Sequence, residues 1–275
     1  MTTLRKLLHN PIGVLALVMT GVVVLTVLVS LVWTPHDPLG VNVPLRWSSP
    51  SLEHPLGTDA LGRDTLSRIM AGSRVTVTTS VLAVALATVV GVAIGALLVF
   101  LPRGLSSALE RLVDLSVAFP TLILAVIIAT FAGGSMWGVV AAIGLGSTST
   151  ITRTILPELR RSVRTDHVLL ARTSGAGPLW LLGRHILPEV TPTLLVRMTQ
   201  LLGAAALAEA GLSYLGLGTP PPAPSWGRML AEHQSQIYTR PEVLAVPALV
   251  IVWTTLAFNL LGDALRDALD SRSEL

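Results

Sequence analysis

The sequence predicts an all-α, polytopic membrane protein with about six transmembrane helices. Hydrophobic residues make up 51% of the 275-residue chain and charged residues only 13%, whereas soluble domains are about one quarter charged. Long uncharged runs recur along the chain, and polar segments rich in arginine separate them. These observations exclude an ordinary soluble domain.

The first apolar run, Ile12 to Trp33, is uncharged and long enough to span a bilayer. It lacks the small-residue cleavage site of a secretory signal peptide, so residues 1–34 are interpreted as an N-terminal tail and the first transmembrane helix. Residues 35–74 are polar and contain several prolines, which predicts an extracytoplasmic segment. Val75 to Leu101 then forms the second span.

Four further runs complete the prediction. The third, Leu112 to Phe131, contains Asp114 near its start and Pro120 in its middle. The others are Met136 to Thr152, Pro192 to Leu215 and Val243 to Leu261. Residues 75–261 are therefore expected to form the transmembrane core, with a cytoplasmic loop at 155–189 and a cytoplasmic tail at 262–275.

The arginines predict the orientation. An even number of spans places both termini on one side, together with Arg103, Arg111, Arg160 and Arg161. Basic residues favour the cytoplasmic side. We therefore expect a multi-pass membrane protein with cytoplasmic N- and C-termini, and the family resemblance given below implies the bacterial plasma (inner) membrane.

The segment from Asp166 to Glu189 is a polar, basic insertion between two apolar runs. Asp166 can cap a short helix that ends at Thr173, and Gly175 suits a left-handed residue after it. A second helix is expected from Leu179 to Leu187, ending at Pro188. Chemistry alone also allows a basic loop lying on lipid headgroups.

A second distinctive segment, His54 to Arg68, precedes the second span. Asp64 and Arg68 are spaced to pair on a helix, with Leu66, Ile69 and Met70 on an apolar side. This pattern predicts an interfacial helix. A metal site from His54, Asp59 and Asp64 is possible by residue type, although no recognised ligand spacing supports it.

Glu209 is the most unusual single residue, because it lies in an otherwise apolar helix. A buried acid usually pairs with a basic residue or faces a water-filled path, and a proton relay is a third possibility. The prolines and glycines after Tyr214 predict an outer loop that folds back, with Trp226 at the membrane interface.

The sequence contains no cysteine, and Lys6, its only lysine, does not follow a glycine-rich phosphate loop. The six histidines show no close metal-ligand spacing and fall outside the predicted spans. The chain is therefore not expected to be an enzyme, to bind a cofactor or metal, or to bind nucleic acid.

Four motifs in order resemble one family. Ala171, Gly175, Leu187 and Pro188 have the spacing of the "EAA" loop, although Leu169 and Leu170 stand where Glu and Ala are usual. The others are HPLGTDALGRDTLSR at 54–68, EAGLSYLGLG followed by PPPAPSWG at 209–227, and FNLLGDALRDALD at 258–270. Together they resemble permease subunits of dipeptide, oligopeptide and nickel ABC importers.

The resemblance implies a type I ABC importer permease fold and a complex with a second permease, one or two ATPase subunits and an extracytoplasmic solute-binding protein. ATP and Mg would bind the ATPase subunits, and the substrate would be a peptide or a related small solute.

The residues expected to couple to the ATPase are Leu169, Ala171, Arg172, Gly175, Ala176, Leu187 and Pro188. Those expected on the translocation pathway or outer gate are Glu209, Ser213 and Tyr214. Those expected to make outer-face contacts are Asp59, Arg63, Asp64, Arg68 and Trp226. The alternative function is a gradient-driven secondary transporter that uses Glu209.

Overall fold

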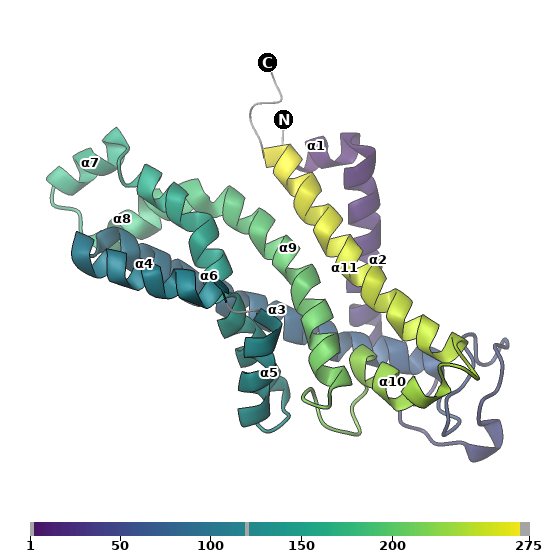
Figure 1. Ribbon diagram of the computed structural model, residues 1–275. Helices are drawn as coiled ribbons and strands as arrows, with labels where there is room; N and C mark the ends of the chain where they lie inside the picture. Colours follow the sequence, from purple (N-terminus) through teal and green to yellow (C-terminus); the bar gives the residue numbers. More distant parts are fainter. Residues whose placement is uncertain (1–2, 119–120, 270–275) are drawn as a thin grey trace.

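The computed structural model describes residues 3–118 and 121–269, and within these ranges the chain is helical with no β-strand. The path runs from α1 and α2 through α3 to α6, then through the short helices α7 and α8 to α9, α10 and α11 (Figure 1). The α-helices are α1 (Thr3–His9), α2 (Pro11–Val32), α3 (Thr65–Phe100), α4 (Arg103–Ala118), α5 (Thr121–Phe131), α6 (Met136–Ser162), α7 (Asp166–Thr173), α8 (Pro178–Leu181), α9 (Leu187–Tyr214), α10 (Trp226–His233) and α11 (Glu242–Leu269). Three short helices of other types are η1 (Val43–Leu45), η2 (Leu182–Ile186) and η3 (Gln234–Gln236).

The all-α membrane fold is confirmed. Five helical segments among the described residues are long and apolar enough to cross a membrane, or six if a bent pair counts as one span. The bent pair is α4 and α5, whose axes meet at 92°. The third run was expected to be a single broken span from Leu112 to Phe131, but α4 begins earlier, at Arg103, and is amphipathic rather than apolar. Pro120, the expected break, lies outside the described residues, as do residues 270–275 of the expected tail.

The expected interfacial helix before the second span does not form a separate element. Residues 65–74 are instead the first turns of α3, which continues to Phe100 without a break. Asp64 caps this helix, because its side chain accepts a hydrogen bond from the backbone N–H of Ser67. Ile69 and Met70 are buried inside the protein. The apolar side of this segment therefore packs on its own chain.

Glycines allow the central helices to approach closely. A Cβ atom added at Gly91 of α3 would lie 2.7 Å from the Ile151 side chain, and one at Gly144 of α6 would lie 3.0 Å from the Ala83 carbonyl oxygen. The Thr152 hydroxyl also donates a hydrogen bond across this interface to the Gly91 carbonyl oxygen. Small residues and interhelical hydrogen bonds are typical of helix pairs in membranes, where the hydrophobic effect does not drive association.

The molecule has two distinct ends (Figure 1). Helix α1, the end of α11 and the short helix α7 lie toward the upper end of the view. Residues 35–64 and α10 lie toward the lower end. Helix α7, which begins the Asp166 to Glu189 loop, therefore lies toward the same end of the molecule as α1 and the end of α11.

Candidate functional site

The loop after α6 folds as a short helix that ends in a glycine turn. The N–H of Gly175 donates to the Arg172 carbonyl, and the N–H of Ala176 donates to the Ala171 carbonyl, both at 3.1 Å. This pair of bonds is the Schellman motif, which requires a left-handed residue. Gly175 supplies it with a φ of +90°. The sequence prediction of a left-handed Gly175 is confirmed.

One side of this loop is anchored and the other is open. Val168, Leu181, Ile186 and Val190 are buried in the main hydrophobic core, and Ala171 and Ala176 pack against it. The opposite side carries apolar side chains that are exposed in this chain alone: Leu169 at 44%, Leu170 at 66%, Leu179 at 84% and Trp180 at 53%. Arg172 is also exposed. The loop therefore presents an apolar surface on a fixed base, which we call the α7 surface.

The second helix of the loop does not end at Pro188 as expected. Residues 178–214 form one helical path, in which η2 is a π-helical turn directly before α9. Proline lacks the N–H that would bond to the preceding turn, and its ring crowds the carbonyl there. A wider π turn before Pro188 relieves that crowding and lets the helix continue. Leu187 and Pro188 thus connect the α7 surface rigidly to the transmembrane helix α9.

Polar contacts also hold the loop to α9. His167 of α7 lies 2.9 Å from the Glu189 carboxylate. The His185 ring lies 5.6 Å from the His167 ring and 5.1 Å from the Trp180 ring. Displacement of α7 would therefore be transmitted to the first turn of α9.

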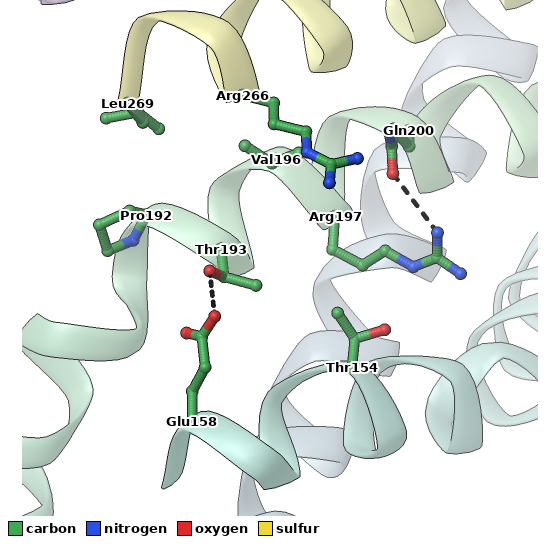
Figure 2. A pocket seen from close by; sticks show the side chains of 9 residues that line it. All are labelled: Thr154, Glu158, Pro192, Thr193, Val196, Arg197, Gln200, Arg266 and Leu269. Atoms are coloured by element: carbon green, nitrogen blue, oxygen red, sulfur yellow. Dashed lines mark hydrogen bonds between the residues drawn. The ribbon is translucent and has the colours of Figure 1, made fainter. Parts of the chain in front are cut away.

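A polar pocket opens between α6, α9 and α11 (Figure 2). Its volume is about 420 Å³. In Figure 2, Glu158 of α6 accepts a hydrogen bond from the Thr193 hydroxyl at 2.6 Å, and Arg197 lies beside Gln200. The Nε of Arg197 is buried and has no hydrogen-bond partner. The complete lining is Thr154, Glu158, Pro192, Thr193, Val196, Arg197, Gln200, Arg266 and Leu269.

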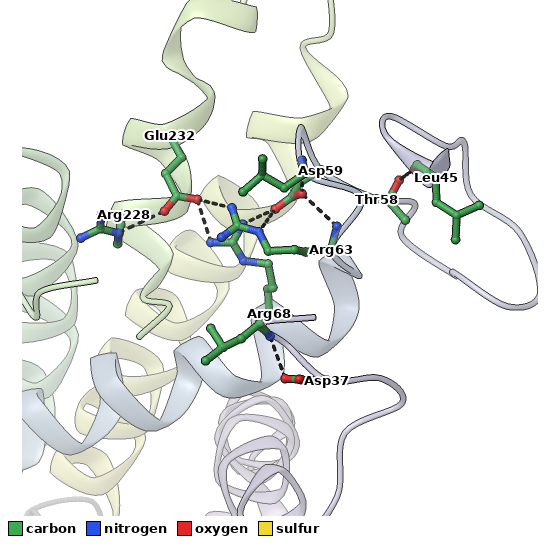
Figure 3. A network of polar contacts seen from close by, with 10 residues as sticks. Asp37, Leu45, Thr58, Asp59, Arg63, Arg68, Arg228 and Glu232 are labelled. Carbon is green, nitrogen blue, oxygen red and sulfur yellow. Dashed lines mark hydrogen bonds and ion pairs between the residues drawn. The ribbon is translucent and has the colours of Figure 1, made fainter. Parts of the chain in front are cut away.

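A buried network of charges closes the opposite end of the molecule (Figure 3). Arg68, which is 1% exposed, is paired with both Asp59 and Glu232, the latter at 2.7 Å. Arg63 bridges the same two acids at 2.7 and 2.9 Å. Arg228 binds the outer oxygen of Glu232 at 3.1 Å. The network ties residues 35–64 to α3 and α10, and we call it the Arg68 network.

The network shifts the titration of its acids. Burial alone raises the pKa of Asp59, but the Arg68 charge and backbone hydrogen bonds from Arg63 and Leu61 outweigh it, and the net pKa lies below the usual range. Burial likewise raises the pKa of Glu232, and Arg68 and Arg63 reverse that shift. Burial and the Arg68 charge lower the pKa of His233. The acids are therefore held ionised and the histidine neutral.

The structure corrects the role expected for several outer-face residues. Asp59, Asp64, Arg68 and Trp226 are all buried, and the side chain of Arg63 is only 14% exposed. Arg68 does not pair with Asp64 as expected, because Asp64 faces back to cap α3 while Arg68 reaches Asp59 and Glu232. Trp226 does not present its side chain to lipid or water, since its indole N–H donates to the Ile69 carbonyl at 3.0 Å inside a hydrophobic cluster.

Sequence reasoning missed Glu232, the acid that completes the Arg68 network. It lies more than a hundred residues after Arg68 on the amphipathic helix α10. Its only local signal is the spacing from Arg228, four residues earlier, which does form an ion pair. Such a pair resembles an ordinary surface salt bridge, so the sequence did not indicate its link to Arg68.

The three residues expected on a pathway lie together near the end of α9. Glu209 is 1% exposed and accepts a hydrogen bond from the Ser213 hydroxyl at 2.6 Å, while its other oxygen has no partner. Among the described residues no arginine lies within ion-pair distance of it, so the pairing considered from the sequence is wrong. Tyr214 is half-exposed and donates to the Gln234 side chain at 2.9 Å.

Comparisons with known proteins identify relatives across nearly the whole chain. Residues 87–274 match the family model described as binding-protein-dependent transport system inner membrane component. A putative peptide permease protein of Brucella suis biovar 1 is 36% identical over 98% of this chain and 90% of its own length. The nickel transport system permease protein NikC of Escherichia coli K12 is 36% identical over 93% of this chain and 92% of its own.

Solved structures show the same fold at lower identity. A chain of the inward-facing MetNI methionine ABC transporter has a TM-score of 0.59 and 19% identity, covering 72% of this chain and 94% of that one. A chain of an amino acid ABC transporter, solved with histidines, has a TM-score of 0.54 and 18% identity, covering 70% of this chain and 90% of that one. These matches confirm the helical arrangement.

Proposed function

The chain belongs to the family of binding-protein-dependent transport system inner membrane components, and from this we propose that it is one of two permease subunits of an ATP-driven importer. It forms the translocation pathway with the second permease and does no covalent chemistry itself. ATP and Mg bind partner ATPase subunits. A solute-binding protein delivers substrate at the end that carries residues 35–64 and α10.

The α7 surface is the observation that carries this proposal. Leu169, Leu170 and Leu179 are exposed on a loop whose other side is fully anchored. Exposed apolar groups on a rigid base are typical of a protein-binding surface. We infer that an ATPase subunit covers this surface, and that Arg172, Ala171, Gly175 and Ala176 hold or border the contact. The rigid connection through Leu187 and Pro188 would transmit ATPase movement to α9.

We propose peptides as the substrate class. Among the relatives reported above, the Brucella protein is named for peptides and the Escherichia coli protein for nickel. The polar pocket between α6, α9 and α11 supports passage of a polar solute, because it offers Glu158, Arg197 and Arg266 as contacts of both charges. Glu209 and Ser213 would lie farther along the same helix, toward the outer side.

Co-purification tests the proposal. The tagged chain is extracted from its native membrane in mild detergent, and the bound proteins are identified by mass spectrometry. We expect a second permease and an ATPase to remain bound. A chain recovered alone, under conditions that preserve a known importer of the same membrane, would favour the gradient-driven alternative.

A single charge on the α7 surface makes the test specific. We predict that Leu170→Asp reduces the amount of ATPase retained by at least about tenfold, because a buried unpaired carboxylate costs several kcal/mol. The matched control is Leu52→Asp, a substitution of a fully exposed leucine on the extracytoplasmic segment. Equal retention of the ATPase by the two variants would contradict docking on the α7 surface.

A further inference from the structure

We propose that His36, His54 and Asp64 bind a divalent transition-metal ion of the zinc and nickel class, which fixes the extracytoplasmic segment to the start of α3. One ligand atom from each of these three side chains lies within 4.8 Å of the other two. His36 follows α2, His54 lies in the middle of the segment and Asp64 caps α3. An ion at this point would join three parts of the chain.

The distances between the side chains fit a small metal ion. Nδ1 of His54 lies 2.8 Å from one Asp64 oxygen, and Nδ1 of His36 lies 3.7 Å from the other. Ligands about 2.0–2.1 Å from a tetrahedral ion are separated by roughly 3.3 Å. The two observed distances lie on either side of this value, so shifts of roughly half an ångström would complete the geometry.

Both imidazoles have a nitrogen that the protein leaves unused. Among the described residues, Nδ1 of His36 and Nε2 of His54 are buried and have no hydrogen-bond partner. His54 as a whole is only 7% exposed. Buried polar atoms are almost always satisfied by a partner, so the unpaired Nδ1 of His36 indicates a ligand. The centroids of the His36 and His54 rings are 4.5 Å apart, and Nδ1 of His54, which contacts Asp64 at 2.8 Å, would bind the same ion with the ring proton on Nε2.

The surroundings hold these groups in place and favour a cation. The Ser67 hydroxyl donates to the Asp64 carboxylate at 2.7 Å and accepts from the His36 backbone N–H at 2.9 Å, so one side chain positions two of the ligands. Outer hydrogen bonds of this kind are typical of metal sites. The adjoining cavity of about 300 Å³ is also lined by Asp37 and Glu53, and no lysine or arginine lines it. The cavity leaves space for a water molecule as a further ligand.

The type of donor atom identifies the class of ion. Two imidazoles and one carboxylate suit zinc, nickel and similar transition metals, whereas magnesium and calcium prefer oxygen ligands alone.

A second cluster of similar composition provides an internal control. Asp59, Glu232 and His233 also approach one another within 4.8 Å. Their carboxylates already bind Arg68 and Arg63, however, and these two positive charges repel a cation. We therefore assign the metal to the His36, His54 and Asp64 cluster alone.

The test uses the full-length chain in lipid nanodiscs, in the complex with which it co-purifies. Zinc and nickel chloride are titrated separately by calorimetry near neutral pH, with magnesium chloride as the negative control. We expect about one equivalent of the transition metal to bind, with affinity lowered at least tenfold in His36→Gln and His54→Gln and unchanged in His233→Gln. This readout is independent of transport, so its failure would leave the proposed function intact.

Cobalt absorption provides a second measurement. Cobalt(II) bound by two imidazoles and a carboxylate in a tetrahedral site should give intense visible bands, which are lost in His54→Gln. Hydrogen exchange should show slower exchange in residues 35–64 when zinc is present. Absence of binding to the wild-type complex, or equal binding by wild type, His36→Gln and His54→Gln, would overturn the proposal. If His36→Gln or His54→Gln fails to assemble, Ser67→Ala is used in its place. This variant keeps both imidazoles, so it should weaken metal binding less than the loss of an imidazole would.

Discussion

The two ends of this protein are stabilised by opposite means. At the α7 surface, Leu169, Leu170 and Leu179 remain exposed and only the inner side is packed. At the other end, Arg68, Asp59 and Glu232 enclose their charges within the chain itself. One end leaves apolar side chains exposed in this chain alone, and at the other end the charged side chains of the Arg68 network are paired within the chain.

The difference shows where each end can respond to a partner. An exposed apolar surface gains stability when it is covered, because apolar area leaves water. An ion network whose charges are already paired within the chain gains no stability from a partner unless those charges rearrange. We therefore expect the α7 surface to set the affinity for the ATPase. The Arg68 network should set the rigidity of residues 35–64.

The largest effect that would test this comparison is expected from Arg68→Ala. The substitution leaves Asp59 buried and deprives Glu232 of its closest cation, and breaking a buried ion pair costs about 3–5 kcal/mol. Thermal unfolding of the detergent-purified protein should show a clear loss of stability. The matched control is Arg228→Ala, because Arg228 pairs with the same Glu232 in a more exposed position and should cost less than about 1 kcal/mol. Equal losses of stability in Arg68→Ala and Arg228→Ala would show that the buried ion pairs stabilise the protein no more than an exposed salt bridge does.

A smaller effect is expected at the α7 surface from Gly175→Ala. A non-glycine residue in the left-handed conformation costs about 1–2 kcal/mol, and the Schellman turn would distort. We expect weaker retention of the ATPase and lower ATP-driven uptake, with normal membrane insertion. Gly177→Ala is a close control, because both positions have open space around an added Cβ but only Gly175 has a positive φ. If Gly175→Ala and Gly177→Ala both lost ATPase retention, the cause would be the added methyl group and not the backbone conformation at Gly175.

The same comparison explains what could be predicted from the sequence. The glycine turn at Gly175 depends on a few neighbouring residues, so local rules were sufficient to locate it. The Arg68 network joins residues 59, 63, 68 and 232 across the fold. No local pattern indicates which acid Arg68 meets. The assignment of Asp64 to Arg68 was wrong for this reason, since helical spacing identified a possible pair and tertiary contacts supplied stronger ones.

Helix ends show the same limit. The apolar runs located the membrane helices, because bilayer thickness imposes a minimum length. They did not show that α3 begins at Thr65, since the cap at Asp64 and the burial of Ile69 and Met70 decide that start. Pro188 was expected to end a helix, and the π turn before it allows the helix to continue.

Glu209 lies between the two ends. Its substitution tests whether a buried acid in a membrane helix contributes to stability as the Arg68 network does. Among the described residues, one oxygen of its carboxylate accepts a hydrogen bond from the Ser213 hydroxyl and the other oxygen has no partner. Glu209→Gln keeps an acceptor for that hydroxyl, so we expect a change in unfolding free energy below about 1 kcal/mol. ATP-driven uptake in proteoliposomes should persist. Uptake that is abolished in this variant and follows an imposed proton gradient would support the gradient-driven alternative.

The smallest predicted effect is a loss of rigidity in residues 35–64 and α10 when the pH falls. The pKa of His233 is lowered from its ordinary value of 6.5, mainly by burial and by the Arg68 charge. The unfolded chain therefore binds a proton at a higher pH than the folded chain, and stability declines as pH drops below that value.

Asp59 and Glu232 also have lowered pKa values, so their contribution is lost only in more acidic solution, below their ordinary values of 3.8 and 4.5. Hydrogen-exchange protection factors, which correct for the intrinsic rate at each pH, should therefore fall slightly in residues 35–64 and α10 between about pH 7.5 and 5.5, whereas those in α7 should not change through this mechanism. His233→Gln should remove this first step and leave the acidic one, because the glutamine does not titrate. An unchanged first step in that variant would assign the pH response to a group other than His233.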